Sequence, residues 1–190
     1  MKTIVWDVDD VLNDLTRLWL DAWRVAHPSC VAYKDLTRNP PDSALGIALE
    51  EYLESLDLFR QSRAYRDMPP VADVKEWFVL NGKKFRHAAL TAAPLRAASA
   101  SAWWTLTHFG EWIRAFHFVP SKRNGEMIVE YDRSKAEFLR RRGDVDLFVD
   151  DNAENVAGAT QAGINALLFP RPWNGSKMAV PELLARVAAL

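Results

Sequence analysis

The sequence lacks several features that would point to other classes of protein. It has a single cysteine, Cys30, which cannot form an internal disulfide, and no apolar run of the roughly 18 residues that a membrane-spanning helix needs. Lys and Arg (24) nearly balance Asp and Glu (25), and a net charge of -1 provides no general attraction to nucleic acid or to an anionic membrane. We therefore expect a soluble, cytoplasmic protein with neither a nucleic-acid polymer nor a membrane as partner.

Motifs for common cofactors and for export are also absent. No Gly-rich phosphate loop of the Walker or dinucleotide type is present, which argues against a nucleotide cofactor. The four histidines show no metal-ligand spacing, so zinc chemistry is not supported. The first ten residues, MKTIVWDVDD, contain acidic residues where a signal peptide would need a long apolar stretch.

What the chain does contain is enough apolar material for a core. Hydrophobic residues make up 49% of the 190 residues and include eight Trp and nine Phe, which is not a disordered composition. Trp103 and Trp104 are adjacent in a predicted helix, so we expect only one of them to face the core. The length suits one α/β domain with a modest insertion.

Apolar strand patterns alternate with helical ones along most of the chain. The predicted strands are residues 3–8, 87–92, 115–119, 145–151 and 165–169. Helices are predicted over 71–80, around Ala98 to Leu106, near 133–142 and near 153–162. This alternation predicts an α/β fold, a doubly wound parallel sheet with helices on both faces and an active site beyond the carboxyl ends of the strands.

The segment after the first strand has a different, helical character. Apolar residues recur at three- and four-residue steps over 14–26, and a loop containing Pro40 and Pro41 follows. Ser43 could then cap a helix over about 44–57. We therefore predict a core of residues 1–13 and 67–190, and a small helical cap of residues 14–66 inserted after the first strand.

Polar residues follow three of the predicted strands. Asp7 and Asp9 come after the first, Thr91 after the second, and Asp150 with Asp151 after the fourth. Because parallel strands end at one edge of the sheet, these side chains are expected to converge there. Carboxylates from separate strands, with a backbone carbonyl, make the oxygen site that Mg²⁺ prefers.

These motifs resemble those of the haloacid-dehalogenase-like (HAD) superfamily of phosphatases. DVDDVLND at 7–14 is similar to its first motif, Asp-x-Asp-x-Val/Thr, directly after the first strand. HAALT, ending at Thr91, resembles the second motif, and LFVDDNAENV at 147–156 resembles the fourth. The order of the motifs agrees as well, so the resemblance implies a HAD-like Rossmann core.

The resemblance implies a role for each matched residue. Asp7 would be the nucleophile that accepts the phosphoryl group, and Asp9 the general acid that then activates water against the aspartyl phosphate. Thr91 would donate a hydrogen bond to the phosphoryl group. Magnesium would be held by Asp7, by the main-chain carbonyl of Asp9 and by Asp150, with Asp151 nearby. An acid two residues after the nucleophile favours phosphate esters over carbon–halogen bonds.

Two lysines compete for the third motif. Lys135 in DRSKAEFL lies at a predicted helix start 15 residues before Asp150, and Lys122 in FVPSKR directly follows the third strand. We favour Lys135, whose ammonium group would keep Asp7 ionised and balance charge on the phosphoryl oxygens.

Within the superfamily, the sequence looks most like the 5′(3′)-deoxyribonucleotidase-like group, whose first motif leads straight into a small helical cap. The implied substrate is a small phosphorylated metabolite, with a nucleoside 5′-monophosphate as the first choice. Two alternatives stay open. One is a phosphatase for a sugar phosphate or another metabolite, and the other is a catalytically idle binding protein. A monomer and a homodimer are both compatible with the sequence.

Overall fold

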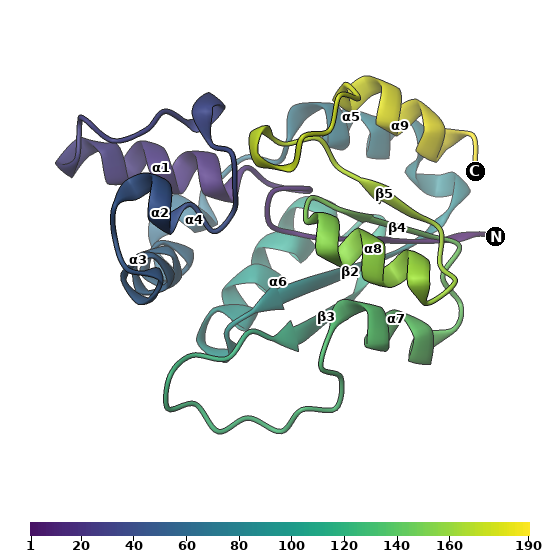
Figure 1. Ribbon diagram of the computed structural model, residues 1–190. Coiled ribbons are helices and arrows are strands. Elements are labelled where there is room, and N and C mark those ends of the chain that lie inside the picture. Colours follow the sequence, from purple (N-terminus) through teal and green to yellow (C-terminus); the bar gives the residue numbers. More distant parts are fainter.

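The computed structural model describes residues 1–190 and contains one five-stranded, wholly parallel sheet (Figure 1). Its strands are β1 (Thr3–Trp6), β2 (Arg86–Ala93), β3 (Ile113–Pro120), β4 (Leu147–Asp150) and β5 (Ala166–Leu168). They lie in the order β3-β2-β1-β4-β5, so β1 is central and the order reverses beside it. The predicted doubly wound α/β fold is confirmed.

Helices cover both faces of the sheet. They are α5 (Ala72–Asn81), α6 (Leu95–Phe109), α7 (Lys135–Arg142), α8 (Ala153–Gln161) and α9 (Val180–Ala188). Successive strand residues point to opposite faces. In β1, Ile4 and Trp6 belong to the apolar cluster that includes α5, α6 and α9, whereas Val5 packs in the cluster with α7 and α8. None of the helices has the length and apolar character needed to cross a membrane.

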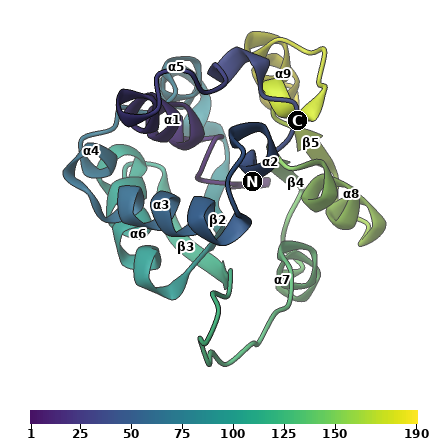
Figure 2. The same cartoon turned by 60° about the vertical axis from the view of Figure 1, so that its left-hand side comes forward.

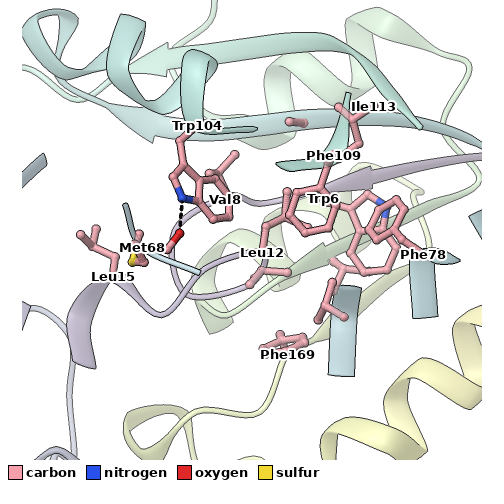
Figure 3. Close-up of a cluster of buried hydrophobic side chains, with 14 of the residues drawn as sticks. Trp6, Val8, Leu12, Leu15, Met68, Phe78, Trp104, Phe109, Ile113 and Phe169 are labelled. Atoms are coloured by element: carbon pink, nitrogen blue, oxygen red, sulfur yellow. Dashed lines mark hydrogen bonds between the residues drawn. The ribbon is translucent and has the colours of Figure 1, made fainter. Parts of the chain in front are cut away.

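The larger core cluster is rich in aromatic side chains (Figure 3). Trp6 packs against Phe78 with ring centroids 5.1 Å apart. Trp104 is fully buried, and its indole N–H donates a hydrogen bond to the carbonyl of Met68 at 2.8 Å. Trp103 is 52% exposed, which confirms that only one of the two adjacent tryptophans faces the core.

Residues 14–66, which we refer to as the cap segment, lie beside the carboxyl ends of the strands, away from the two chain termini (Figure 1). The segment contains α1 (Leu15–Ala26), α2 (Asp42–Leu45), α3 (Leu49–Gln61) and α4 (Arg63–Arg66). Its two connections to the core run side by side, because Asn13 and Pro70 form an antiparallel bridge. Figure 2 shows α3 near α6, and the two helices are in contact.

The prediction of one helix over 44–57, capped by Ser43, was wrong. The structure has two helices there, α2 and α3, because Gly46 adopts a left-handed backbone with φ 69° and ends α2. Ser43 lies inside α2, and its hydroxyl accepts a hydrogen bond from Arg38 instead of capping a helix. The C-terminal helix α9 was not predicted, although Pro181 stands in its first turn.

Candidate active site

Asp7 lies at the carboxyl end of the central strand. Its backbone N–H donates to the carbonyl of Val149 at 2.8 Å, which continues the pairing of β1 with β4. Its side-chain Oδ1 accepts the N–H of Val8 at 2.7 Å. The chain then turns sharply at Asp10, which has φ 62°, a left-handed conformation that Asp tolerates better than most residues. This turn directs the chain into α1, and Asp7 remains in the buried base of the site.

Lys135 occupies the first position of α7, where Ser134 caps the helix by accepting the N–H of Glu137. Its Nζ lies 2.6 Å from Asp7 Oδ2 and 2.7 Å from Asp150 Oδ2, and all three residues are buried. Burial disfavours the charged ammonium, but the two carboxylates outweigh it and raise the pKa of Lys135. Lys135 is therefore a fixed cation between two strand ends.

Three carboxylates meet at this point. Oxygens of Asp7, Asp150 and Asp151 lie within 4.8 Å of one another, and all three residues are buried. Burial raises the pKa of Asp7 and of Asp151 well above the ordinary value, and neighbouring carboxylates raise both further. Only Lys135 opposes this negative charge. The oxygen donor set and its excess charge fit a divalent cation such as Mg²⁺.

Further hydrogen-bond donors, from the backbone and from side chains, hold Asp150 and Asp151 in place. Asp150 Oδ1 accepts the backbone N–H of Asn152 at 2.8 Å, and the Asn155 amide donates to the same carboxylate at 3.2 Å. The indole N–H of Trp173 donates to Asp151 Oδ2 at 3.0 Å. The orientation of both carboxylates is thus fixed by protein donors.

Asp9 has different partners from the other acids. Arg60 of α3 donates two hydrogen bonds to its Oδ2, at 3.2 and 3.0 Å. Its Oδ1 accepts from the hydroxyl of Tyr65 at 3.2 Å and from the amide of Asn13 at 3.1 Å. The Asp9 carboxylate therefore contacts the cap segment and is not one of the three clustered carboxylates. The predicted magnesium ligand at this residue was its main-chain carbonyl, which stays a prediction.

Thr91 and the two candidate lysines differ in whether they line the cavity above the acids. Thr91 is buried in β2 and lines the same cavity as Asp7 and Lys135. Lys122 is 45% exposed and pairs with Glu130 at 2.6 Å, and it does not line this cavity. The structure therefore brings together Asp7, Thr91 and Lys135, and leaves Lys122 outside.

A cavity of about 620 Å³ opens above these residues. The core supplies the acids, Lys135 and Thr91, and the cap segment supplies residues including Arg38, Tyr52 and Arg60. Both parts of the chain thus form the walls. A molecule that fills the cavity would contact both parts.

Sequence reasoning missed several residues around the cavity. Arg60 and Asp57 are paired with each other and with residues far away in the sequence. Arg171 pairs with Asp14 at 2.7 Å and donates to the backbone carbonyl of Asp10. No motif or short spacing marks these contacts, so only the position of Arg60 on a helix with Asp57 three residues before it could have suggested part of the cluster.

No protein-family model matches the sequence, and no curated protein is significantly similar to it. Solved structures do share its fold. A haloacid-dehalogenase-like hydrolase from Streptococcus pneumoniae has a TM-score of 0.62 at 11% identity, covering 97% of this chain and 90% of that one. A β-phosphoglucomutase-like protein from Thermotoga maritima has a TM-score of 0.59 at 19% identity, covering 100% and 99%.

A third similar structure is named protein tyrosine kinase A, from Mycobacterium tuberculosis, with a TM-score of 0.63 at 16% identity, covering 100% of this chain and 98% of that one. The chain therefore has the α/β fold of HAD-like hydrolases. Proteins named for different activities have this fold. None of these three structures is named as a nucleotidase, so they give no support to the resemblance to the deoxyribonucleotidase-like group.

Proposed function

We propose that this chain is a magnesium-dependent phosphatase that hydrolyses small phosphate monoesters through an aspartyl phosphate on Asp7. The observation that carries the proposal is the buried contact of Lys135 with Asp7 and Asp150, beside Asp151 and at the base of a cavity. A structural ion pair would need one carboxylate for one ammonium group. Three acids beside one lysine leave negative charge that a divalent cation would neutralise, and the cation would also attract the anionic phosphoryl group.

Asp7 is the nucleophile in this proposal. Its Oδ1 is held by the N–H of Val8 and its Oδ2 by Lys135, so the carboxylate is oriented before substrate binds. Lys135 opposes the rise in the pKa of Asp7, which favours the anionic, nucleophilic form, and then balances charge on the phosphoryl oxygens, and Thr91 donates a hydrogen bond to the same group. A bound Mg²⁺ would be held by Asp7, Asp150 and Asp151 and would neutralise negative charge on the phosphate.

Asp9 acts as the general acid and base. It protonates the oxygen of the leaving group and afterwards takes a proton from the water that attacks the aspartyl phosphate. Its contacts with Arg60, Tyr65 and Asn13 fix the carboxylate beside the cavity. The acid is thus positioned by residues of the cap segment as well as by its own turn.

Residues 14–66 act as a cap that limits the substrate to small molecules and shields the site from water. Two substrate classes follow from the sequence and the cavity. Tyr52 and Trp173 line the cavity, which leaves a nucleoside 5′-monophosphate as a candidate because their rings could contact a base. A sugar phosphate or other metabolite phosphate is the alternative, and a panel of both classes assayed with magnesium separates them.

The test of the reaction uses a generic aryl phosphate with Mg²⁺ and with EDTA. The wild type should release phosphate only with the metal, and Asp7→Asn should abolish release, because the amide keeps the shape of the side chain but is not a nucleophile. Asp73→Asn, at an exposed acid in the first turn of α5, is the control and should keep full activity. Undiminished turnover by Asp7→Asn would end the nucleophile assignment. A wild type without activity on the whole panel would favour the idle binding protein.

A further inference from the structure

We propose that Arg60 and Arg123 form a second anion-binding site in the cavity, so that the substrate is a phosphate monoester carrying another anionic group, either a carboxylate or a second phosphate. This inference rests on the proposed function, since it assumes that one phosphate binds at Asp7. It adds the class of the rest of the substrate, and it favours a metabolite phosphate over a nucleoside 5′-monophosphate, which has no second anionic group.

Three arginines from different elements surround one buried carboxylate, that of Asp57 in α3. Arg60 donates to Asp57 Oδ1 at 3.0 Å, and Arg96, at the start of α6, donates to Oδ2 at 2.8 Å. Arg123, in the connection after β3, donates to both oxygens, at 2.6 and 2.9 Å. Asp57 is thus saturated by four N–H groups, about the number that a carboxylate can accept.

The charges of this cluster do not cancel. Three guanidinium groups face Asp57, and the only other carboxylate in contact with them is Asp9, which binds Arg60. Glu126 accepts the backbone N–H of Arg123 but makes no ion pair with its guanidinium. Three cations and two anions leave one positive charge without a partner. Arg96 is 45% exposed and can be solvated, but Arg60 and Arg123 are buried, and an anion from the substrate would favourably offset the positive charge that they present to the cavity.

The unused donors lie where a substrate can reach them. The side chains of Arg60 and Arg123 are only 8% and 11% exposed, and both residues line the cavity. A guanidinium group has five N–H donors. Arg60 uses three N–H groups on Asp9 and Asp57, so two remain. Arg123 uses two on Asp57 and two on Ser121, so one remains. A planar pair of such groups matches the geometry of a carboxylate or a phosphate.

The position of the two arginines also separates the two ends of the substrate. The acids Asp7 and Asp151 lie at the base of the cavity, where a free carboxylate would be repelled unless a metal is bound. Arg60 and Arg123 lie where the cap segment meets the core. One end of the ester would therefore bind at Asp7 and the anionic tail at the arginines.

A purely structural role for the cluster makes a different prediction. If the arginines only hold the cap segment against the core through Asp57, Arg96 and Arg123 should matter alike, since both come from the core and bind the same carboxylate. Only Arg123 lines the cavity. Comparing variants of these two residues therefore distinguishes an anion-binding role from a purely structural role in holding the cap segment against the core.

The experiment compares three phosphate esters of one three-carbon chain, whose other end is a hydroxyl, a carboxylate or a second phosphate. The ratio of kcat/KM between an anionic ester and the hydroxyl ester measures the preference, with Mg²⁺ present throughout. The wild type should prefer at least one anionic ester by about tenfold or more, the effect of one charge-assisted hydrogen bond. Arg123→Gln should reduce this ratio to near one, Arg123→Lys should retain part of it, and Arg96→Gln should leave it unchanged.

Other outcomes would overturn the anion site or the proposed function. Equal kcat/KM for all three esters in the wild type overturns the anion site but not the proposed function. So does an equal loss of preference in Arg96→Gln and Arg123→Gln. If neither these esters nor the aryl phosphate is hydrolysed, the proposed function fails, and calorimetric binding of the same three esters decides the anion site. Binding preference lost in Arg123→Gln supports it, and equal affinities for the three esters overturn it.

Discussion

The guanidinium of Arg60 donates two hydrogen bonds to one oxygen of Asp9, at 3.2 and 3.0 Å, although 51 residues separate them in the sequence. Arg60 belongs to α3 in the cap segment, and Asp9 follows the central strand of the sheet. The pair therefore connects the cap segment to a proposed catalytic residue. Its neighbours Asp57 and Tyr65 extend this connection.

Replacing Arg60 with Met should destabilise the protein by about 3 kcal/mol, because it leaves buried carboxylates without one of their partners. The measurement is the free energy of unfolding in urea. Arg63→Met is the control, since the ion pair of Arg63 with Asp67 is 91% and 63% exposed and should contribute less than about 1 kcal/mol. Equal losses in the two variants would show that the buried pair contributes no more to the free energy of unfolding than the exposed pair.

The proposed acids and their lysine could be predicted from the sequence because each one follows or precedes a regular element. Asp7 and Asp150 lie next to strands with clear apolar patterns. Lys135 follows Ser134, and the spacing of Ser134 and Glu137 is that of a helix start. Since parallel strands share one edge, local pattern was enough to bring these residues together.

The cluster around Asp57 could not be predicted in this way. Arg123 lies 66 residues after Asp57 and Arg96 lies 39 residues after it. These contacts depend on how α3 packs against the core, which no local periodicity specifies. The break between α2 and α3 at Gly46 was missed for a related reason, because a single glycine inside a helical pattern is often tolerated.

Lys135→Met should lower kcat by about 100-fold or more on a phosphate monoester, because the variant loses the only cation beside Asp7 and Asp150. Lys122→Met should keep nearly full activity, since Lys122 pairs with Glu130 outside the cavity. Steady-state kinetics on both variants makes the comparison. The reverse order of effects would assign the third motif to Lys122.

Trp104→Phe should destabilise the fold by about 2–4 kcal/mol. The change removes the hydrogen bond to the Met68 carbonyl and leaves space in a fully buried site (Figure 3). Trp103→Phe changes the adjacent, half-exposed ring and should cost well under half as much. Chemical denaturation of both variants tests this, and similar losses would mean that the two indoles contribute equally.

His87 should make stability depend on pH below neutrality. Its Nδ1 accepts the indole N–H of Trp6, and burial lowers the pKa of His87 from 6.5 to about 4. The unfolded chain therefore takes up a proton between these values that the folded protein does not. This part of the stability is complete above about pH 6.5 and is lost towards pH 4, by up to about 3 kcal/mol.

Urea unfolding at several pH values checks this prediction. The pH dependence should be weaker between pH 6.5 and 4 in His87→Asn, which has no titrating ring. His27→Asn changes an exposed histidine and should follow the wild type. Parallel curves for wild type and His87→Asn would exclude a contribution from His87.

The most direct measurement of the proposed mechanism is to trap the phosphoryl group on the protein. Asp9→Asn should still accept phosphate from an activated aryl ester, whose leaving group needs no acid, but should hydrolyse the aspartyl phosphate slowly. After acid quenching and mass spectrometry of peptides, we expect one phosphoryl group on Asp7, removable by hydroxylamine. A phosphoryl group on another residue would contradict the proposed mechanism. So would phosphate release by Asp9→Asn at the rate of the wild type with no phosphoryl group trapped on the protein.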